Sequence, residues 1–196
     1  MESSLTLKRT NTFLTHLQCP QCGATYSAEE LNTVCKAPDC QSTLFAQYDT
    51  SAGLNKEVLK GRPANMWRYH EMLPVIDPQF IVSMGEGFTP LMPVVNQPEH
   101  TRDNHVFFKN EAGNPTGSFK ARGISMAISK AKELGVTTIA IPTAGNAGGA
   151  LSAYASRAQM KAVVYMPRLT PQLFKNECRL YGAELVEVDG NISDCG

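Results

Sequence analysis

Residues 114–123 read NPTGSFKARG, a short turn that runs directly into a helical pattern. Asparagine, proline and glycine favour a turn at the start of this stretch. The pattern places Lys120 in the first turn of the helix, partly buried against Phe119, where the positive end of the helix dipole disfavours a charged ammonium. A lysine that gives up its proton readily is the kind that forms a Schiff base. The alternative on these residues alone is a lysine whose charged end reaches water from a helix start.

Helices and strands alternate downstream of this turn. Short apolar strands that alternate with helices indicate right-handed βαβ crossovers and a parallel sheet, so the fold class is α/β. Two further strands are predicted upstream, at 80–82 and, as a buried strand, at 106–109. The other predicted elements are a helix at about 118–134 with Ile124, Ile128, Ala131 and Leu134 on its apolar face, a strand at 136–141, a helix ending at 158, a strand at 162–166, a helix with Thr170 as its N-cap that ends at Gly182, and a strand at 184–188.

The loop at 142–149, PTAGNAGG, follows the first strand after the Lys120 helix. Ligands of such sheets bind where strands end and helices begin, so neighbouring strands could bring this loop and Lys120 to one site. Its glycines allow close approach of a ligand, and amides at a helix start suit an anion such as a carboxylate. Asn146 offers both a donor and an acceptor. The alternative is a glycine-rich helix packed tightly on the sheet. The loop lacks the Gly-x-Gly-x-x-Gly order of a dinucleotide site.

Four of the six cysteines fall in one short N-terminal segment: Cys19, Cys22, Cys35 and Cys40. Such clustering in a chain without a secretion signal favours a metal over disulfides. Two close pairs of thiolates can wrap a tetrahedral Zn²⁺ with no open position, which predicts a structural, zinc-ribbon-like module at 18–48. The second pair has four intervening residues instead of two. Iron–sulfur ligation and a redox pair are the alternatives, and Cys178 and Cys195 are expected to be small buried apolar residues.

The chain has 196 residues, of which 18 are basic and 18 acidic, so its formal net charge is +0. A protein that binds nucleic acid or an anionic membrane normally carries a basic excess. No run is apolar enough to span a bilayer, and residues 1–11 lack the apolar core of a signal peptide. The sequence therefore predicts a cytoplasmic protein with a small-molecule partner, and neither a nucleic acid nor a membrane.

Three motifs together resemble one known family. Residues 108–111 (FKNE) with 114–123, and residues 143–148 (TAGNAG), resemble the cofactor-lysine motif and its partner loop in the fold type II pyridoxal-phosphate enzymes. Within this family, residues 66–69 (MWRY) and 85–91 (GEGFTPL), with the cysteine-rich segment ahead of them, are most similar to the threonine synthases. The resemblance covers nearly the whole chain.

The resemblance implies roles for individual residues. Lys120 would hold pyridoxal 5'-phosphate as a Schiff base and shuttle protons, and Asn146 would hydrogen-bond the cofactor's 3-hydroxyl. The reaction would be that of a carbon–oxygen lyase, which converts O-phosphohomoserine to threonine and phosphate. The residues implied to bind the substrate are Gly85, Thr89, Thr143, Ala144, Gly145, Asn146, Ala147 and Gly148.

The sequence departs from the family pattern at two places. Ala121 stands where many threonine synthases carry aspartate, which leaves room for a relative that acts on another amino acid. Thr143 and Ala144 replace the commoner serine pair, although Thr143 keeps a hydroxyl. The alternatives are therefore a dehydratase or a cysteine synthase-like enzyme, or a truncated zinc-binding fragment without activity.

Length sets the expected organisation. Catalytic chains of this family run well beyond 196 residues, so we expect the N-terminal portion of an enzyme, inactive alone, with an incomplete parallel sheet. The glycine-rich loop that cradles the cofactor phosphate would lie beyond Gly196, and a full-length form could be a homo-oligomer. The expected divisions are a tail at 1–17, the module at 18–48, a connector at 49–79 and the catalytic region at 80–196.

Overall fold

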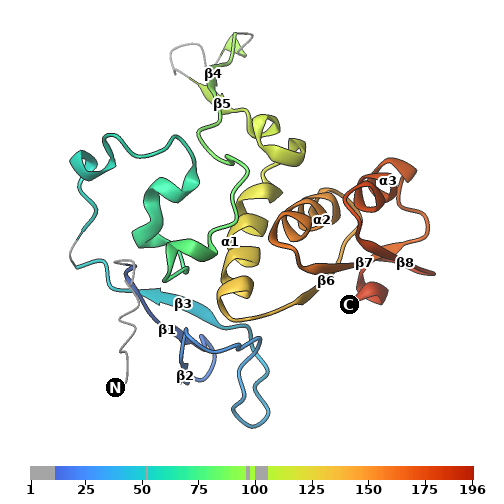
Figure 1. Ribbon diagram of the computed structural model, residues 1–196, viewed down its shortest axis with the longest axis horizontal. Coiled ribbons are helices and arrows are strands. Elements are labelled where there is room, and N and C mark those ends of the chain that lie inside the picture. Colours follow the sequence, from blue (N-terminus) through green and yellow to red (C-terminus); the bar gives the residue numbers. More distant parts are fainter. Residues whose placement is uncertain (1–11, 52, 96–97, 100–105) are drawn as a thin grey trace, which may run out of the picture. The chain divides into compact units, whose positions relative to one another are not determined.

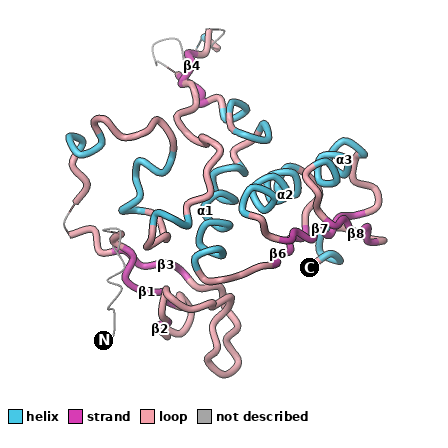
Figure 2. The backbone as a smooth tube through the Cα atoms, in the orientation of Figure 1, coloured by secondary structure: helices cyan, strands magenta, loops and turns pink. Residues whose placement is uncertain are grey.

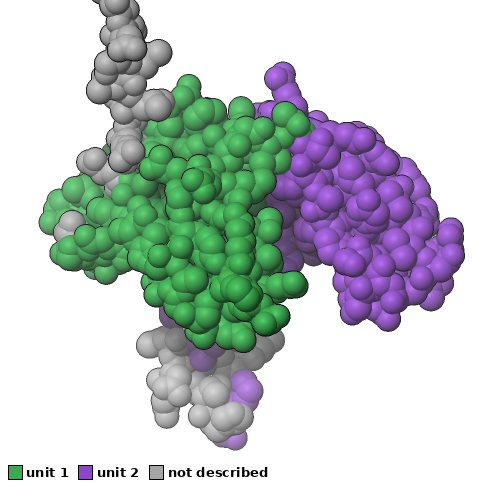
Figure 3. Space-filling model, turned by 90° about the horizontal axis from the view of Figure 1, so that it is seen from below, with its two compact units in different colours: residues 1–63, 67–82, 126–137 green, residues 64–66, 83–125, 138–196 purple. Residues whose placement is uncertain are grey.

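The computed structural model describes residues 12–51, 53–95, 98–99 and 106–196. The chain divides into two compact units, coloured separately in Figure 3. Unit 1 comprises residues 1–63, 67–82 and 126–137, and unit 2 comprises 64–66, 83–125 and 138–196. These units cut across the predicted divisions, because the connector and part of the lysine helix pack with the N-terminal module. The first eleven residues of the predicted tail lie outside the described residues.

The N-terminal module of unit 1 is a small antiparallel sheet. Its strands are β1 (Leu14–Gln18), β2 (Thr25–Tyr26) and β3 (Phe45–Tyr48), in the order β2-β1-β3. β1 pairs with both neighbours, and its register places Leu17 opposite Tyr26 and Ala46. The module therefore begins at Leu14, four residues before the predicted boundary. Cys19 follows β1 directly, so the sheet fixes the start of the cysteine-rich segment.

The segment after this sheet contains short 3₁₀ helices: η1 (Lys56–Leu59), η2 (Met66–Met72) and η3 (Pro78–Phe80). The strand predicted at 80–82 is wrong. Asp77 caps η3, because its Oδ1 accepts the Gln79 N–H at 3.0 Å, and Pro78 occupies the first helical position. A side-chain cap and a proline at the helix start favour a helical turn over a strand.

Unit 2 contains the parallel sheet that the sequence predicts. β6 (Thr138–Pro142), β7 (Lys161–Pro167) and β8 (Glu184–Val188) pair in parallel in the order β6-β7-β8. The helices α2 (Asn146–Ala158) and α3 (Gln172–Leu180) lie on one face of this sheet, and η7 (Ile192–Cys195) lies on the other (Figures 1 and 2). Alternation of strands and helices thus gives the α/β fold. Among the described residues, no helix is long and apolar enough to cross a membrane.

The strand before the lysine turn does not belong to the parallel sheet. β5 (Phe107–Lys109) pairs antiparallel with β4 (Leu91–Pro93), and Met92 lies opposite Phe108. Both strands are exposed, so the predicted burial of residues 106–109 is wrong. An apolar run in a two-stranded pair lacks the second layer that would cover it. Residues 93–104, whose polar sequence predicts an irregular segment, fall largely outside the described residues.

The helix α1 (Lys120–Glu133) begins and ends close to the predicted bounds. Its fully buried positions are Ala121, Ser125, Ile128 and Ser129, and of the predicted apolar face only Ile128 is among them. The two serines can be buried because their hydroxyls are used. Ser129 Oγ accepts the Val82 N–H at 2.8 Å, and Ser125 Oγ donates to Glu86. Polar residues thus form half of the buried face.

The helix α3 starts later than predicted. It begins at Gln172 with Pro171 at the N-cap, and ends at Leu180. Thr170 does not cap it, because its Oγ1 is buried without a hydrogen-bond partner among the described residues. Pro171 also removes one backbone N–H from this helix start, which lessens the need for a side-chain cap.

Candidate active site

Lys120 is the first residue of α1 and so lies in the first turn of the helix, where the sequence predicts it. The turn that delivers it consists of η5 (Glu111–Gly113) and η6 (Pro115–Gly117). Thr116 has φ +59° and Gly117 has φ +66°, so a β-branched residue occupies the left-handed region. Lys120 Nζ lies 4.5 Å from the centre of the Phe119 ring, a cation–π contact. Both side chains are exposed, so the contact with Phe119 is found but the predicted partial burial is not.

Ser118 carries an unused hydroxyl beside this lysine. The residue is 7% exposed, and its Oγ is buried with no hydrogen-bond partner in the part of the chain that the structure describes. A buried hydroxyl without a partner costs about 1–3 kcal/mol. Such an atom next to the lysine is suited to a bound group that supplies the missing partner.

The loop at 143–148 begins where β6 ends. Thr143 is buried, and its Oγ1 accepts the Gly145 N–H at 3.2 Å, which holds the loop in a tight turn. The Gly148 N–H donates to Gly145 O at 3.0 Å. Asn146 and Ala147 lie in the first turn of α2, where N–H groups have no intrahelical acceptor. The exposed Asn146 side chain and these amides can therefore receive an anionic or polar ligand.

The turn that precedes Lys120 does pack near the second predicted loop's helix, but the cause differs from the prediction. η6 packs against α2, the helix into which the loop at 143–148 leads. Neighbouring parallel strands were expected to bring the loops together, yet β5 lies outside the parallel sheet. Packing of the lysine turn on a helix replaces the predicted strand adjacency.

Two of the loop's glycines face protein rather than open space. A Cβ on Gly148 would lie 2.9 Å from Thr143 Cγ2 and 3.0 Å from Cys178 Sγ. A Cβ on Gly149 would lie 2.2 Å from the Glu177 carboxylate. The alternative of tight packing is therefore found at these two positions. At Gly145 the backbone is less crowded, because a Cβ there would have its nearest neighbour, in the Phe174 ring, 4.0 Å away.

Glu86 fastens the loop at 85–89 from within. Its side chain is fully buried and accepts hydrogen bonds from the hydroxyls of Ser125 and Tyr154, each at 2.6 Å, and from the Met84 N–H at 2.9 Å. Burial alone raises the pKa of a carboxyl, but the bonds from Ser125 and Tyr154 outweigh it and lower the pKa of Glu86. Burial, and then the hydrogen bond to Glu86, raise the pKa of Tyr154. The loop is therefore anchored by an ionised carboxylate.

Gly87 and Thr89 are engaged with the protein itself. Gly87 has φ +99°, and a Cβ there would lie 2.7 Å from Met66 N, so this position requires glycine. The Met66 N–H donates to Glu86 O at 2.8 Å, which joins Met66 to the segment at 85–91. The Thr89 hydroxyl donates to Glu111 Oε1 at 2.7 Å. Gly85, in contrast, is exposed.

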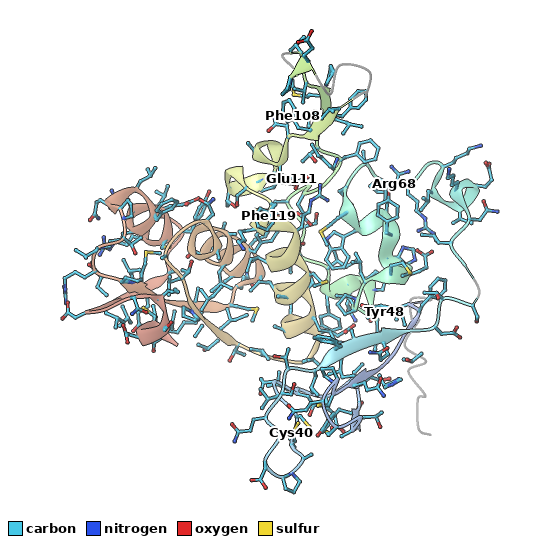
Figure 4. All side chains as sticks on the ribbon, turned by 180° about the vertical axis from the view of Figure 1, so that it is seen from behind. Cys40, Tyr48, Arg68, Phe108, Glu111 and Phe119 are labelled. Carbon is cyan, nitrogen blue, oxygen red and sulfur yellow. The ribbon has the colours of Figure 1, made fainter. Side chains whose placement is uncertain are left out.

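The four N-terminal cysteines converge in unit 1, on the segment that carries the label Cys40 in Figure 4. Their Sγ atoms all lie within 4.8 Å of one another, and the pairs Cys19–Cys40 and Cys22–Cys35 are 3.5 Å apart. Four sulfurs at 2.3 Å from a tetrahedral Zn²⁺ would be about 3.8 Å apart, so the donor set fits this ion. All six cysteines are free, and Cys178 and Cys195 are buried as predicted.

Sequence reasoning assigned no role to Glu86, to the hydroxyl of Ser118, or to Tyr26. The Tyr26 hydroxyl lies 3.2 Å from Cys35 Sγ, and this hydrogen bond lowers the pKa of the Cys35 thiol. One signal was present for Glu86, because a charged residue between two glycines in an apolar region needs partners. The partners themselves lie 39 and 68 positions away, which no local pattern reveals.

A family model described as "Pyridoxal-phosphate dependent enzyme" matches residues 82–196, more than half of the chain. The chain therefore belongs to this family of enzymes.

Within the family, the chain is similar to threonine synthases. It is 35% identical over 178 residues to the threonine synthase of Methanocaldococcus jannaschii, a match that covers 90% of this chain and 44% of that protein. It is 43% identical over 128 residues to the threonine synthase of Synechocystis sp., covering 64% of this chain and 34% of the relative. The chain thus spans less than half the length of the curated relatives that it matches.

A solved structure supports the fold. The crystal structure of a hydrogen sulfide-producing enzyme from Fusobacterium nucleatum aligns with a TM-score of 0.51 and 28% sequence identity. The alignment covers 59% of this chain and 37% of that one.

Proposed function

We propose that this chain supplies the lysine-bearing part of a threonine synthase, which converts O-phosphohomoserine to threonine and phosphate. The observation that carries the proposal is the exposed Lys120 at the start of α1, two residues after the unpartnered buried hydroxyl of Ser118 and directly after a turn that packs against α2. The similarity to two threonine synthases supports the choice of reaction within the family.

Pyridoxal phosphate, when bound, acts as an electron sink for a carbanion next to the amino group of the substrate. The residues present fit this group. Lys120 Nζ is accessible to hold it covalently and to carry a proton to and from the substrate carbon. Asn146 can donate to or accept from the cofactor's 3-hydroxyl, and Ser118 Oγ can gain the partner that it lacks.

The substrate carboxylate would lie at the loop at 143–148. The first-turn amides of Asn146 and Ala147 and the positive end of α2 favour an anion there. Thr143 would act by holding the loop in shape, since its hydroxyl already accepts from Gly145, and the backbones of Ala144 and Gly145 and the bonded Gly148 amide shape the same turn. Gly85 and the main chain near Thr89 would line the other side of the substrate.

A full-length form of the protein should release phosphate from O-phosphohomoserine and form threonine in equal amounts. Lys120→Ala should abolish both, whereas Lys132→Ala, at the other end of α1, should leave them unchanged. Formation of a 2-oxo acid from threonine, or of cysteine from an activated serine and sulfide, would instead assign the dehydratase or cysteine synthase alternative. This comparison is informative because Ala121 stands next to the lysine where many threonine synthases carry aspartate.

We also propose that the four N-terminal cysteines hold a structural Zn²⁺ in a zinc-ribbon-like module. The support is the short mutual distances of the sulfurs and the burial of Cys19 and Cys35. The thiolates would occupy all four positions of the ion, so no position would be left for a substrate. The cytoplasmic location and the oligomeric state stay predictions from the sequence.

A further inference from the structure

Glu111 is a hub for side chains from three segments of unit 2. It accepts hydrogen bonds from Arg122 Nε at 2.7 Å and from its second guanidinium nitrogen at 2.9 Å. It also accepts from the hydroxyl of Thr89 and from Asn114 Nδ2, each at 2.7 Å. Two-pronged binding of a guanidinium by a carboxylate is among the strongest and most directional polar contacts in proteins. Figure 4 shows Glu111 near the start of α1, which Phe119 marks.

These contacts join the lysine turn to the loop at 85–89. Asn114 turns its other side-chain atom, Oδ1, to the Gly87 N–H at 2.9 Å. Lys109 Nζ donates to the Thr89 carbonyl at 2.7 Å, and Arg122 reaches the Thr89 hydroxyl at 3.2 Å. The carboxylate of Glu111 therefore lies between the lysine turn and the loop at 85–89 and is bonded to both.

The Glu111–Arg122 pair also links the two ends of the lysine turn. Arg122 lies two residues after Lys120 on α1, so the pair spans the segment that contains Thr116. That residue keeps a left-handed backbone at φ +59°, which is strained for a β-branched side chain. Strain of this kind persists only where the surrounding structure over-determines it. The pair supplies such a constraint, because it fixes both ends of the turn.

We propose that Glu111 is a positioning residue that presents Lys120 to the cofactor, by holding the lysine turn against α1 and the loop at 85–89. This inference rests on the proposed function, since it takes Lys120 to be the cofactor lysine. Glu111 itself touches only protein groups, and its part is to hold Lys120 Nζ in place before the cofactor arrives.

Unit 1 contains a matched pair for comparison. Arg62 binds Glu71 with two hydrogen bonds, at 2.9 and 2.6 Å. The hydrogen bond from Arg62 holds the pKa of Glu71 at about 2, and that from Arg122 holds the pKa of Glu111 at about 2. The two pairs are alike in chemistry, but Glu71 belongs to unit 1, whereas Glu111 and the lysine turn belong to unit 2. Substitution of either Glu71 or Glu111 should lower the stability of the fold. Only substitution of Glu111 should also displace Lys120.

The test uses a full-length form of the protein and measures the rate at which pyridoxal phosphate, fixed by borohydride, labels Lys120. Peptide mass spectrometry compares this label with that on the other lysines. Glu111→Gln keeps the shape of the side chain but loses the charge, and should slow labelling of Lys120 about tenfold or more. Glu71→Gln should label at the wild-type rate. Glu111→Asp, which keeps the charge, should recover part of the rate. Hydrogen exchange of the amides at 114–122 should rise in Glu111→Gln and not in Glu71→Gln.

Wild-type labelling in Glu111→Gln, an equal loss in Glu71→Gln, or wild-type protein that is not labelled at Lys120 would each overturn the proposal. A different outcome would refute the proposed reaction. Protein that labels Lys120 in the predicted order of variants but forms no threonine from O-phosphohomoserine would refute the threonine synthase assignment and leave the role of Glu111 standing.

Discussion

The hydroxyl of Tyr154 donates a 2.6 Å hydrogen bond to the carboxylate of Glu86, across 68 positions of sequence. Tyr154 lies on α2, which carries the candidate carboxylate-binding turn at its start, and Glu86 lies in the loop at 85–89. Both side chains are fully buried. This bond therefore ties the glycine-rich helix to the loop that would face it across the substrate.

Tyr154→Phe should lower the free energy of unfolding by about 1–3 kcal/mol, because it removes a donor from a buried carboxylate and leaves the ring in place. Denaturant unfolding measures the effect. Tyr69→Phe is the control, since Tyr69 is 42% exposed and should change stability by less than about 0.5 kcal/mol. Equal stabilities of the Tyr154 variant and wild type would show that the bond contributes nothing.

Two adjacent glycines in α2 should respond differently to alanine. Gly148→Ala places a Cβ against the buried side chains of Thr143 and Cys178, which have little room to move, and should cost about 1–3 kcal/mol. Gly149→Ala meets only the end of the Glu177 side chain, which is half-buried and can rotate away. Helix propensity then favours alanine by up to about 1 kcal/mol. Thermal unfolding of both variants checks the order, and a Gly149 variant that is the less stable of the two would contradict it.

Acid should destabilise the protein partly through Glu111. The hydrogen bond from Arg122 lowers the pKa of this carboxyl from 4.5 to about 2 in the folded state. A carboxyl with a depressed pKa contributes stability that is present above pH 4.5 and is lost as the pH falls toward 2. Glu111→Gln cannot titrate, so its free energy of unfolding should fall less steeply than that of wild type in this window. Denaturant titrations at several pH values measure the slopes, and parallel slopes would refute the linkage.

The cysteine cluster should bind one metal ion per chain. Elemental analysis of protein purified without chelator should find zinc near one equivalent, and Cys19→Ser should lower it strongly, because a thiolate ligand is lost. Cys195→Ser is the control, since its thiol contacts the Asn191 carbonyl in unit 2. Unchanged zinc in the Cys19 variant would rule out the proposed site.

Local patterns predicted much of unit 2. Strand β8 has the predicted bounds, and α1 starts within two residues of its predicted position, because apolar periodicity and glycine stops are properties of short windows. The pairing of β5 with β4 could not be predicted in this way. An apolar run such as residues 106–109 has the same pattern whether another layer covers it or not.

The sequence motifs of the candidate site could be predicted, but the contacts from other segments that hold those motifs in place could not. Lys120 and Asn146 lie in recognisable local sequences, so their places at the starts of α1 and α2 followed from the chain itself. Glu86 and Glu111 act through partners on other segments, and those contacts depend on how the segments pack. The burial of Ser125 and Ser129 has the same origin, since a serine on a helix can be buried only where another segment supplies its hydrogen-bond partner.

The central claim is that Lys120 is the lysine that binds pyridoxal phosphate. The direct measurement is incubation of a full-length form of the protein with pyridoxal phosphate, reduction with borohydride and location of the pyridoxyl group by peptide mass spectrometry. The account predicts one modified residue, Lys120, and no stoichiometric label in Lys120→Ala. A label that resides on another lysine, or an equal scatter over the exposed lysines of wild type, would contradict it.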